Sequence, residues 1–271
     1  MPTQEFAADG DRSEARPPYV PILLYHAVAD APLPGFEAYT VTRRMFSEHV
    51  RAVAASGRTA LTISQVAAGI QGSAPWPASP VALRFDDGYD DTQQSVEELL
   101  GAGLGATVYV TTGTVGSRRG MTAQAVAELA GYPGRVEVGA HTISHATLDE
   151  ISARRAKEEI VGSREMLEQV VGAAIASFAY PHGAFNRRVR QIVIDAGYLS
   201  AGAVKNALAR TNDDVFSIPT WTVGSATPAD RIQEVLEGQN VPLSWSHERA
   251  STTAYRWVRR LRRRSRTFGG A

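Results

Sequence analysis

Short apolar runs alternate with longer amphipathic segments through most of this 271-residue chain. The apolar runs are typical of buried strands, and the segments between them have the apolar spacing of helices. Such alternation indicates βαβ units and a parallel sheet, so the chain is predicted to be α/β. Periodicity alone leaves open a closed barrel and an open doubly wound sheet. The expected strands cover 20–26, 81–85, 106–111, 136–140, 174–180, 198–203 and 215–223, and the expected helices cover 43–56, 91–100, 122–130, 152–171, 187–196 and 230–236.

Acidic and imidazole side chains follow two of these predicted strands. Asp86 and Asp87 come directly after strand 81–85, and His141 and His145 follow strand 136–140. Neighbouring residues of a strand point to opposite faces, so one carboxylate can hold a metal while the other reaches water or substrate. One Asp and two His provide three ligands and leave a coordination position open. The same residue types also occur in iron oxygenases, so this pattern alone leaves that chemistry open.

Three motifs in order resemble those of polysaccharide deacetylases of the carbohydrate esterase 4 (NodB-like) family. The family motif T-F-D-D-G is seen as Arg84–Gly88, H-[ST]-x-x-H is matched by His141–His145, and R-x-P-[YF] or Y-P-x-G is echoed by Phe178–Gly183. The resemblance implies a deformed (β/α)7 TIM-like barrel. It further implies a metal-dependent hydrolase that removes acetyl groups from N-acetylated sugars or polysaccharides and so cleaves non-peptide carbon–nitrogen amide bonds.

The resemblance also assigns roles to residues of this chain. Asp87, His141 and His145 are the expected ligands of a divalent metal, with Zn²⁺ preferred and Co²⁺, Ni²⁺ or Fe²⁺ as alternatives. Asp86 is the expected general base, which takes a proton from the attacking water. The third motif is expected to bind substrate and to direct a backbone N–H toward the developing oxyanion. Its residues are Tyr180, Pro181, His182 and Gly183.

The chain departs from the family pattern at two positions. The motif arginine is replaced by Ala179, so an arginine that orients the base is expected to be missing. No segment after Tyr198 matches the family's C-terminal L-x-H motif, and His247 is interpreted as a surface residue. His26 ends the first predicted strand after an apolar run, so it is the expected proton donor or substrate contact. His49 lies in the first predicted helix and is interpreted as structural or exposed.

The ends of the chain differ in composition from its middle. Residues 1–18 are expected to form a disordered leader, 19–240 the catalytic domain, and 241–271 an extension with a basic tail. The segment Arg256–Arg266 holds seven Arg, whereas the rest of the chain has 21 basic and 28 acidic residues. The tail is interpreted either as a solvated terminus or as a peripheral contact with an anionic membrane. The acidic body argues against nucleic-acid binding.

The remaining composition narrows the compartment and the chemistry. The chain has no Cys, which excludes disulfides and thiolate chemistry, and its first 18 residues lack the apolar stretch of a secretory signal. A cytoplasmic enzyme acting on an N-acetylated saccharide or glycoside is therefore expected. Two alternatives stay open: an esterase or other amide hydrolase with the same site, and a sugar-binding protein with impaired catalysis.

Overall fold

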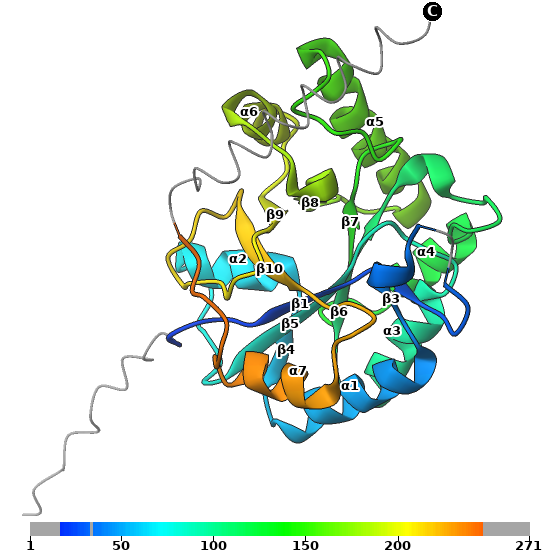
Figure 1. Cartoon of the computed structure of the whole chain (residues 1–271). Helices are drawn as coiled ribbons and strands as arrows, with labels where there is room; N and C mark the ends of the chain where they lie inside the picture. The colour runs from blue at the N-terminus through cyan, green and yellow to red at the C-terminus, as the bar shows by residue number, and fades with distance from the viewer. Residues whose placement is uncertain (1–16, 33–34, 246–271) are drawn as a thin grey trace, which may run out of the picture.

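Seven parallel strands close into a barrel in the computed structural model, which describes residues 17–32 and 35–245 (Figure 1). The order around the barrel is β1-β10-β9-β8-β7-β6-β5, and pairing of β1 with β5 closes the ring. Closure selects the deformed (β/α)7 barrel over the open sheet, as the family resemblance implied. The strands are β1 (Ile22–Tyr25), β5 (Pro80–Phe85), β6 (Ala106–Val110), β7 (Val136–Ala140), β8 (Ser177–Ala179), β9 (Ser200–Val204) and β10 (Ile218–Thr222).

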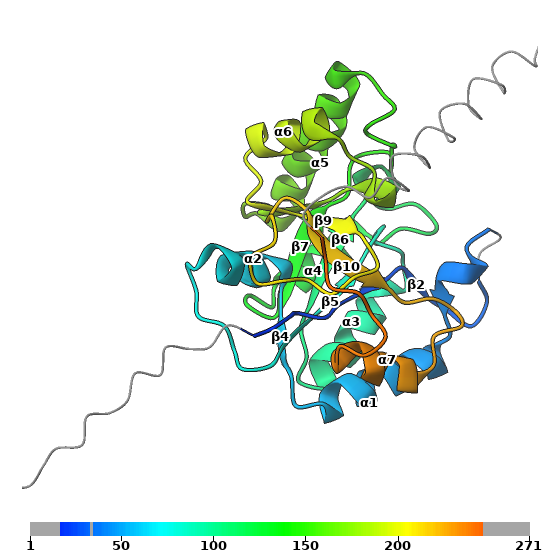
Figure 2. The same ribbon diagram turned by 60° about the vertical axis from the view of Figure 1, so that its left-hand side comes forward.

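Helices cover the outside of the barrel at the positions that the apolar spacing predicted. On α1 the predicted apolar positions Phe46, Val50 and Val53 are buried. Figures 1 and 2 show α1 beside α7 and α5 beside α6, in agreement with the contacts between these pairs. The helices are α1 (Arg43–Ala55), α3 (Thr92–Gly101), α4 (Ala123–Ala130), α5 (Ala153–Val171), α6 (Arg187–Asp195) and α7 (Ala229–Leu236).

Several elements were not predicted from the sequence. The helix α2 (Ile63–Gln71) begins with a capping box between Thr62 and Gln65, and its apolar residues pack against the barrel interior, including Ile22 and Ile218 at the starts of their strands. It therefore covers the amino-terminal end of the barrel. The other unpredicted elements are β2 (Ala27–Val28), β3 (Thr40–Val41), β4 (Thr59–Leu61) and the 3₁₀ helices η1 (Glu37–Tyr39), η2 (Thr112–Thr114) and η3 (Pro181–Gly183).

The strand β5 divides its side chains between the barrel interior and the helical layer. Leu83 and Phe85 belong to the core beneath the helices, whereas Ala82 belongs to the cluster inside the barrel. The side chain of Arg84 lies over the ring of Tyr109 in the same interior. Because side chains alternate along a strand, Asp86 continues this inward series at the carboxyl end of β5.

The two ends of the chain lie mostly beyond the described part. The predicted leader is described only at residues 17 and 18, and the predicted extension only at 241–245; Arg256–Arg266 and His247 lie outside the described residues. Within 17–32 and 35–245, no helix combines the length and the apolar character that crossing a membrane requires.

Candidate active site

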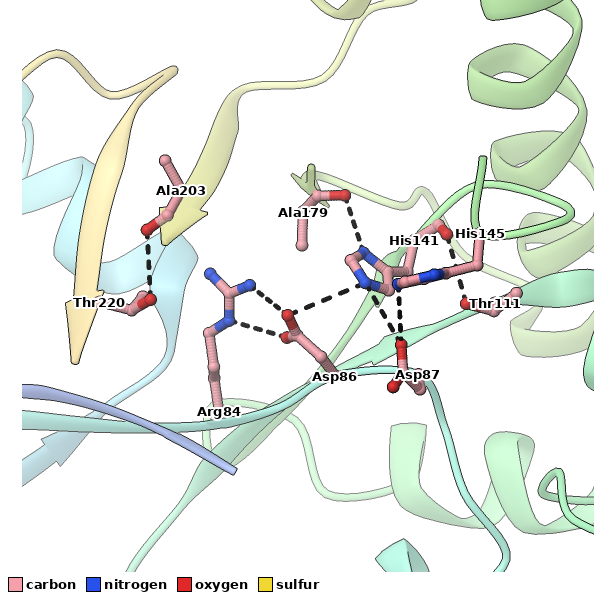
Figure 3. A network of polar contacts seen from close by, with 9 residues as sticks. All are labelled: Arg84, Asp86, Asp87, Thr111, His141, His145, Ala179, Ala203 and Thr220. Atoms are coloured by element: carbon pink, nitrogen blue, oxygen red, sulfur yellow. Dashed lines mark hydrogen bonds and ion pairs between the residues drawn. The ribbon is translucent and has the colours of Figure 1, made fainter. Parts of the chain in front are cut away.

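Asp87, His141 and His145 come together at the carboxyl ends of β5 and β7 (Figure 3). Oδ1 of Asp87 lies 3.5 Å from Nε2 of His141 and 3.2 Å from Nε2 of His145. Metal–ligand bonds of about 2.0–2.1 Å at tetrahedral angles separate their ligand atoms by about 3.3 Å. The two separations from Asp87 therefore match a divalent metal, and all three ligand atoms lie within 4.8 Å of one another. They belong to the three residues that the sequence motifs indicated.

The protonation of His141 suits a ligand. Its Nδ1 lies 2.8 Å from the carbonyl oxygen of Ala179, to which the ring donates, so Nε2 keeps a free lone pair toward Asp87. Burial lowers the pKa of His141 to about 3 and also lowers the pKa of His145, so both rings are neutral at pH 7.

The turn that carries the two His is fixed from both sides. The carboxylate of Glu159, buried on α5, accepts the backbone N–H groups of Ile143 and Ser144 at 2.9 and 2.8 Å and the Ser144 hydroxyl at 2.6 Å. On the other side, the amides of Thr112 and Gly113 donate to the carbonyls of Thr142 and Ile143. Two backbone N–H groups, two carbonyls and the Ser144 hydroxyl of this tight turn thus have fixed partners, which hold its shape.

Backbone strain gathers around the same residues. Asp87, Thr142, His145 and His182 all have positive φ, between 56° and 75°, which is uncommon outside glycine. Gly88 also has a φ of 70°, and a Cβ there would press on Val110, so glycine suits this position. Strain of this kind persists only where surrounding contacts hold it, and it clusters at functional sites.

An arginine does hold the Asp86 carboxylate, so the prediction that such a residue is missing is wrong. Arg84, two residues earlier on β5, donates from Nε to Oδ1 at 2.8 Å and from Nη2 to Oδ2 at 2.5 Å. Residues two apart on a strand share a face, which brings both side chains into the interior. Arg84 stands where the family motif has Thr, and the motif itself does not indicate where the guanidinium of an arginine at this position lies.

Asp86 and Asp87 have opposite ionisation tendencies in this site. Burial disfavours the Asp86 carboxylate, but Arg84 and His141 outweigh burial and hold its pKa below the usual value. Burial raises the pKa of Asp87, which has no guanidinium of its own. A cation at the three-residue site would supply the missing positive charge beside Asp87.

A cleft of about 830 Å³ opens above these residues. His26 lines it, and the His26 ring lies 5.2 Å from the ring of Tyr39, so the structure places the expected proton donor on the same face as Asp86. Sequence reasoning missed the aromatic wall, because isolated aromatic residues carry no motif signal. The cleft is lined by His26, Gly35, Phe36, Tyr39, Asp86, Asp87, His141, His145, Thr147, His182, Val204, Asn206, Trp221 and Thr222.

The third motif contributes to the cleft mainly through His182. The His182 ring lies 4.5 Å from that of His145, edge to face, and lines the cleft. The side chain of Tyr180 is buried instead, where it stacks on Phe185 and donates its hydroxyl to the Phe216 carbonyl. Pro181 is buried as well. Tyr180 and Pro181 therefore shape the loop, while His182 faces the cleft.

Tyr89 is a further site residue that sequence reasoning missed. Burial, and after it the negative charge of the Asp87 carboxylate, raises the pKa of the Tyr89 hydroxyl. Tyr89 also lines a second hollow of about 440 Å³, which shares Phe36, Asp87 and His145 with the cleft. The position of Tyr89 directly after the Asp-Asp-Gly motif is the sequence feature that could have identified it as a site residue.

Comparison with known proteins agrees with the family resemblance. The sequence profile of the polysaccharide deacetylase family matches residues 74–201. This stretch begins before β5, ends in β9 and contains the carboxylate pair, the His pair and the third motif. This part of the chain is therefore similar to the polysaccharide deacetylase family, whose carbohydrate esterase 4, or NodB-like, motifs it resembles.

Individual relatives are distant in sequence but similar in fold. A protein of Bacillus subtilis (strain 168) named "Putative polysaccharide deacetylase YxkH" is 21% identical over 204 residues, which cover 75% of this chain and 71% of that protein. The structure of deacetylase PplD from Streptococcus pyogenes, in complex with acetate, is 20% identical with a TM-score of 0.74, covering 81% of this chain and 99% of that one. IcaB from Ammonifex degensii is 19% identical with a TM-score of 0.72, covering 82% and 98%.

Proposed function

We propose that this chain is a metal-dependent deacetylase that removes acetyl groups from N-acetylated sugar residues. The observation that carries the proposal is the convergence of Asp87, His141 and His145 beside the buried carboxylate of Asp86. The three-ligand set suits Zn²⁺ first, with Co²⁺, Ni²⁺ or Fe²⁺ as alternatives. A metal bound there would polarise the acyl carbonyl and lower the pKa of a coordinated water toward about 7.

Different residues of the chain would carry out the two proton transfers of the reaction, from the attacking water and to the leaving nitrogen. Asp86, whose Oδ2 lies 3.8 Å from Nε2 of His141, is placed to accept the proton of a water that attacks the acyl carbon. The carbon–nitrogen bond breaks, His26 gives the leaving nitrogen its proton, and acetate and a free amine result. The backbone N–H of His182, in the loop beside His145, is the proposed donor to the developing oxyanion.

The cleft supports a saccharide as the substrate. Its volume of about 830 Å³ lies within the range of ligand sites. Phe36, Tyr39 and Trp221 present apolar ring surface, and Asn206 and Thr222 present polar groups, a combination that fits the faces and hydroxyls of a sugar. The homologous structure of PplD was determined with acetate, the product that this reaction would release.

Acetate release from a panel of N-acetylated saccharides of increasing length tests this proposal, together with metal content by elemental analysis. We expect release from at least one N-acetylated saccharide, about one metal per chain, and loss of both metal and activity in Asp87→Ala. An acetyl ester panel run in parallel separates amide from ester hydrolysis. Saccharide binding without release by metal-loaded protein would favour the binding-protein alternative, and full metal content in Asp87→Ala would contradict the ligand assignment.

A further inference from the structure

We propose that Arg84 is the positioning residue for the base Asp86, in place of the family's third-motif arginine, and that Gly202 provides the space it needs. The inference rests on the proposed deacetylase function. It concerns a residue inside the first motif, at the place where the family has Thr. Arg84 is completely buried, as is the Asp86 carboxylate except for 2% of its surface.

The contacts of Arg84 hold the Asp86 carboxylate in one orientation, and this arrangement is called the clamp below. Both Asp86 oxygens accept from the guanidinium, from Nε and Nη2, in a two-pronged arrangement that fixes the plane of the carboxylate (Figure 3). The carbon of the guanidinium lies 4.9 Å from the centre of the Tyr109 ring, which supports it from β6. Of the four site residues, Asp86 is the one that accepts hydrogen bonds from Arg84, whereas Asp87 lies beside the two His, and His141 donates to the Ala179 carbonyl.

Small residues on the opposite strands leave room for this clamp. A Cβ added to Gly202 on β9 would collide with Nη1 of Arg84. Gly202 pairs with Ala179 on β8, the position at which the family motif has its arginine. A Cβ at Gly139 on β7 would likewise collide with the Tyr109 ring that supports the guanidinium. An arginine at 179 and one at 84 would therefore reach for the same carboxylate and the same space.

Loss of the clamp predicts a specific defect. Without the two hydrogen bonds from the guanidinium, the Asp86 carboxylate is free to rotate away from the attacking water. Turnover would then fall, while KM and metal binding persist. A purely structural arginine would lower stability without lowering kcat selectively.

Arg84→Met tests the clamp against a matched control. Arg164 on α5 also pairs with a carboxylate, that of Glu168, lies over a tyrosine ring and abuts a glycine, but is remote from the cleft. We expect Arg84→Met to lower kcat by about 100-fold or more, with little change in KM or metal content. Arg164→Met should keep the wild-type kcat.

Two further variants keep the test decisive if Arg84→Met does not fold. Gly202→Ala changes no polar residue of the site, and its kcat should fall because the added Cβ displaces the Arg84 guanidinium. The relocation variant Arg84→Thr with Ala179→Arg restores the family arrangement and should recover most of the turnover that Arg84→Thr alone loses. Circular dichroism and urea unfolding establish that each variant is folded.

The outcomes separate this inference from the proposed function. An active wild type whose Arg84→Met and Gly202→Ala variants keep kcat would overturn the role of Arg84 and leave the deacetylase proposal standing. Failure of the relocation variant to exceed Arg84→Thr would overturn the exchange between positions 84 and 179. A folded, metal-loaded wild type that is inactive on every acylated substrate would overturn the proposed function, and the role of Arg84 with it.

Discussion

Asp86 and Asp87 are neighbours in the chain but have different surroundings. Asp86 points into the barrel and is held by Arg84, whereas Asp87 turns toward the two His with a φ of 75°. A regular strand would already send the two carboxylates to opposite faces. The positive φ of Asp87 brings both to the same end of the barrel, which allows one to act on a proton while the other holds a metal.

The first prediction separates these roles. Asp86→Asn should retain metal, because Asp86 is outside the three-ligand set, but should lose about 10²–10⁴-fold in kcat, because an amide cannot accept the water's proton. Steady-state kinetics with elemental analysis checks both parts. Asp90→Asn, an exposed neighbour in the same loop, is the control and should keep wild-type kcat. Wild-type turnover in Asp86→Asn would place the base elsewhere.

The second prediction concerns His26. His26→Ala should reduce hydrolysis of an N-acetyl amide far more than hydrolysis of an activated aryl acetate, because an aryl oxide leaves without a proton. The ratio of the two kcat/KM values, measured against wild type, reports the proton transfer and cancels any general loss of structure. Equal losses on both substrates would make His26 a binding residue. A larger amide-selective loss in His182→Ala would move the role to His182.

At the scale of elements, α5 controls the geometry of the metal site from outside the barrel. Glu159 is fully buried and reaches the turn between His141 and His145 with three hydrogen bonds, while Arg155 pairs with it from the surface. Partners of this kind orient ligands without touching the metal. No sequence pattern predicted this contact, because Glu159 lies in a helix with many other charged residues and has nothing that distinguishes it from them.

The third prediction follows from this contact. Glu159→Gln should lower metal affinity by about 10–100-fold, because a neutral amide accepts more weakly from the two backbone N–H groups and turns its NH2 group toward the Arg155 guanidinium. Competition with a chelator measures the change. Glu158→Gln is the matched control, since Glu158 is exposed and pairs only with Arg154 and Arg155. Equal affinity in the two variants would show that the turn holds its shape without Glu159.

The fourth prediction concerns His49, which joins α1 to the barrel. His49 is fully buried, with Nε2 2.9 Å from the Thr227 carbonyl and Nδ1 3.2 Å from the Tyr25 hydroxyl, so it is structural. Burial lowers the pKa of His49 below 6.5. Below pH 6.5 the unfolded chain therefore binds a proton at His49 that the folded chain excludes, and stability falls as pH falls toward the folded pKa.

Urea unfolding between pH 7.5 and 5 checks this sign. The stability advantage of wild type over His49→Gln should be largest above pH 6.5 and should shrink below it, by at most about 1.4 kcal/mol per pH unit for one proton. The difference between the two proteins removes the contribution of other groups, such as His141. Parallel pH curves would contradict a neutral buried His49.

At the scale of the whole molecule, charge is separated between the body and the C-terminal segment. The seven Arg of Arg256–Arg266 are accompanied by Trp257, Val258 and Leu261, in a part of the chain outside the described residues. Each basic residue near an anionic surface contributes about 1 kcal/mol of attraction. The acidic body would be repelled by the same surface and would face away from it.

The fifth prediction tests this membrane contact. Full-length protein should co-sediment with vesicles of anionic lipid at low salt and be released at high salt, because salt screens the attraction. A truncation after Tyr255 should stay in the supernatant and keep its activity on a soluble substrate. Neutral vesicles are the control. Equal partitioning of both proteins would leave the segment a solvated terminus.

The sequence by itself determined most of the fold and the residues of the candidate metal site. Apolar periodicity and strand–helix alternation located all seven barrel strands and six outer helices. They could do so because the spacing of apolar residues in each segment follows from the face that the segment buries. It did not locate α2, whose nine residues cover the barrel end and form a weaker signal. Asp87, His141 and His145 were identifiable because metal ligands must be particular residue types at strand ends.

Only the tertiary structure decided how the strands close and what holds the base. Pairing of β1 with β5 joins segments almost 60 positions apart in the chain, and no local pattern specifies that the sheet ends there. The sequence also suggested that Asp86 lacks an orienting arginine, because the motif position holds Ala179. The barrel supplies Arg84 instead, and Gly202, on a distant strand, leaves the space. Arg84 can replace the motif arginine only because its side chain, the Asp86 carboxylate and Gly202 lie at the same level inside the barrel. The strand register of the closed barrel sets that level, so the sequence alone does not reveal it.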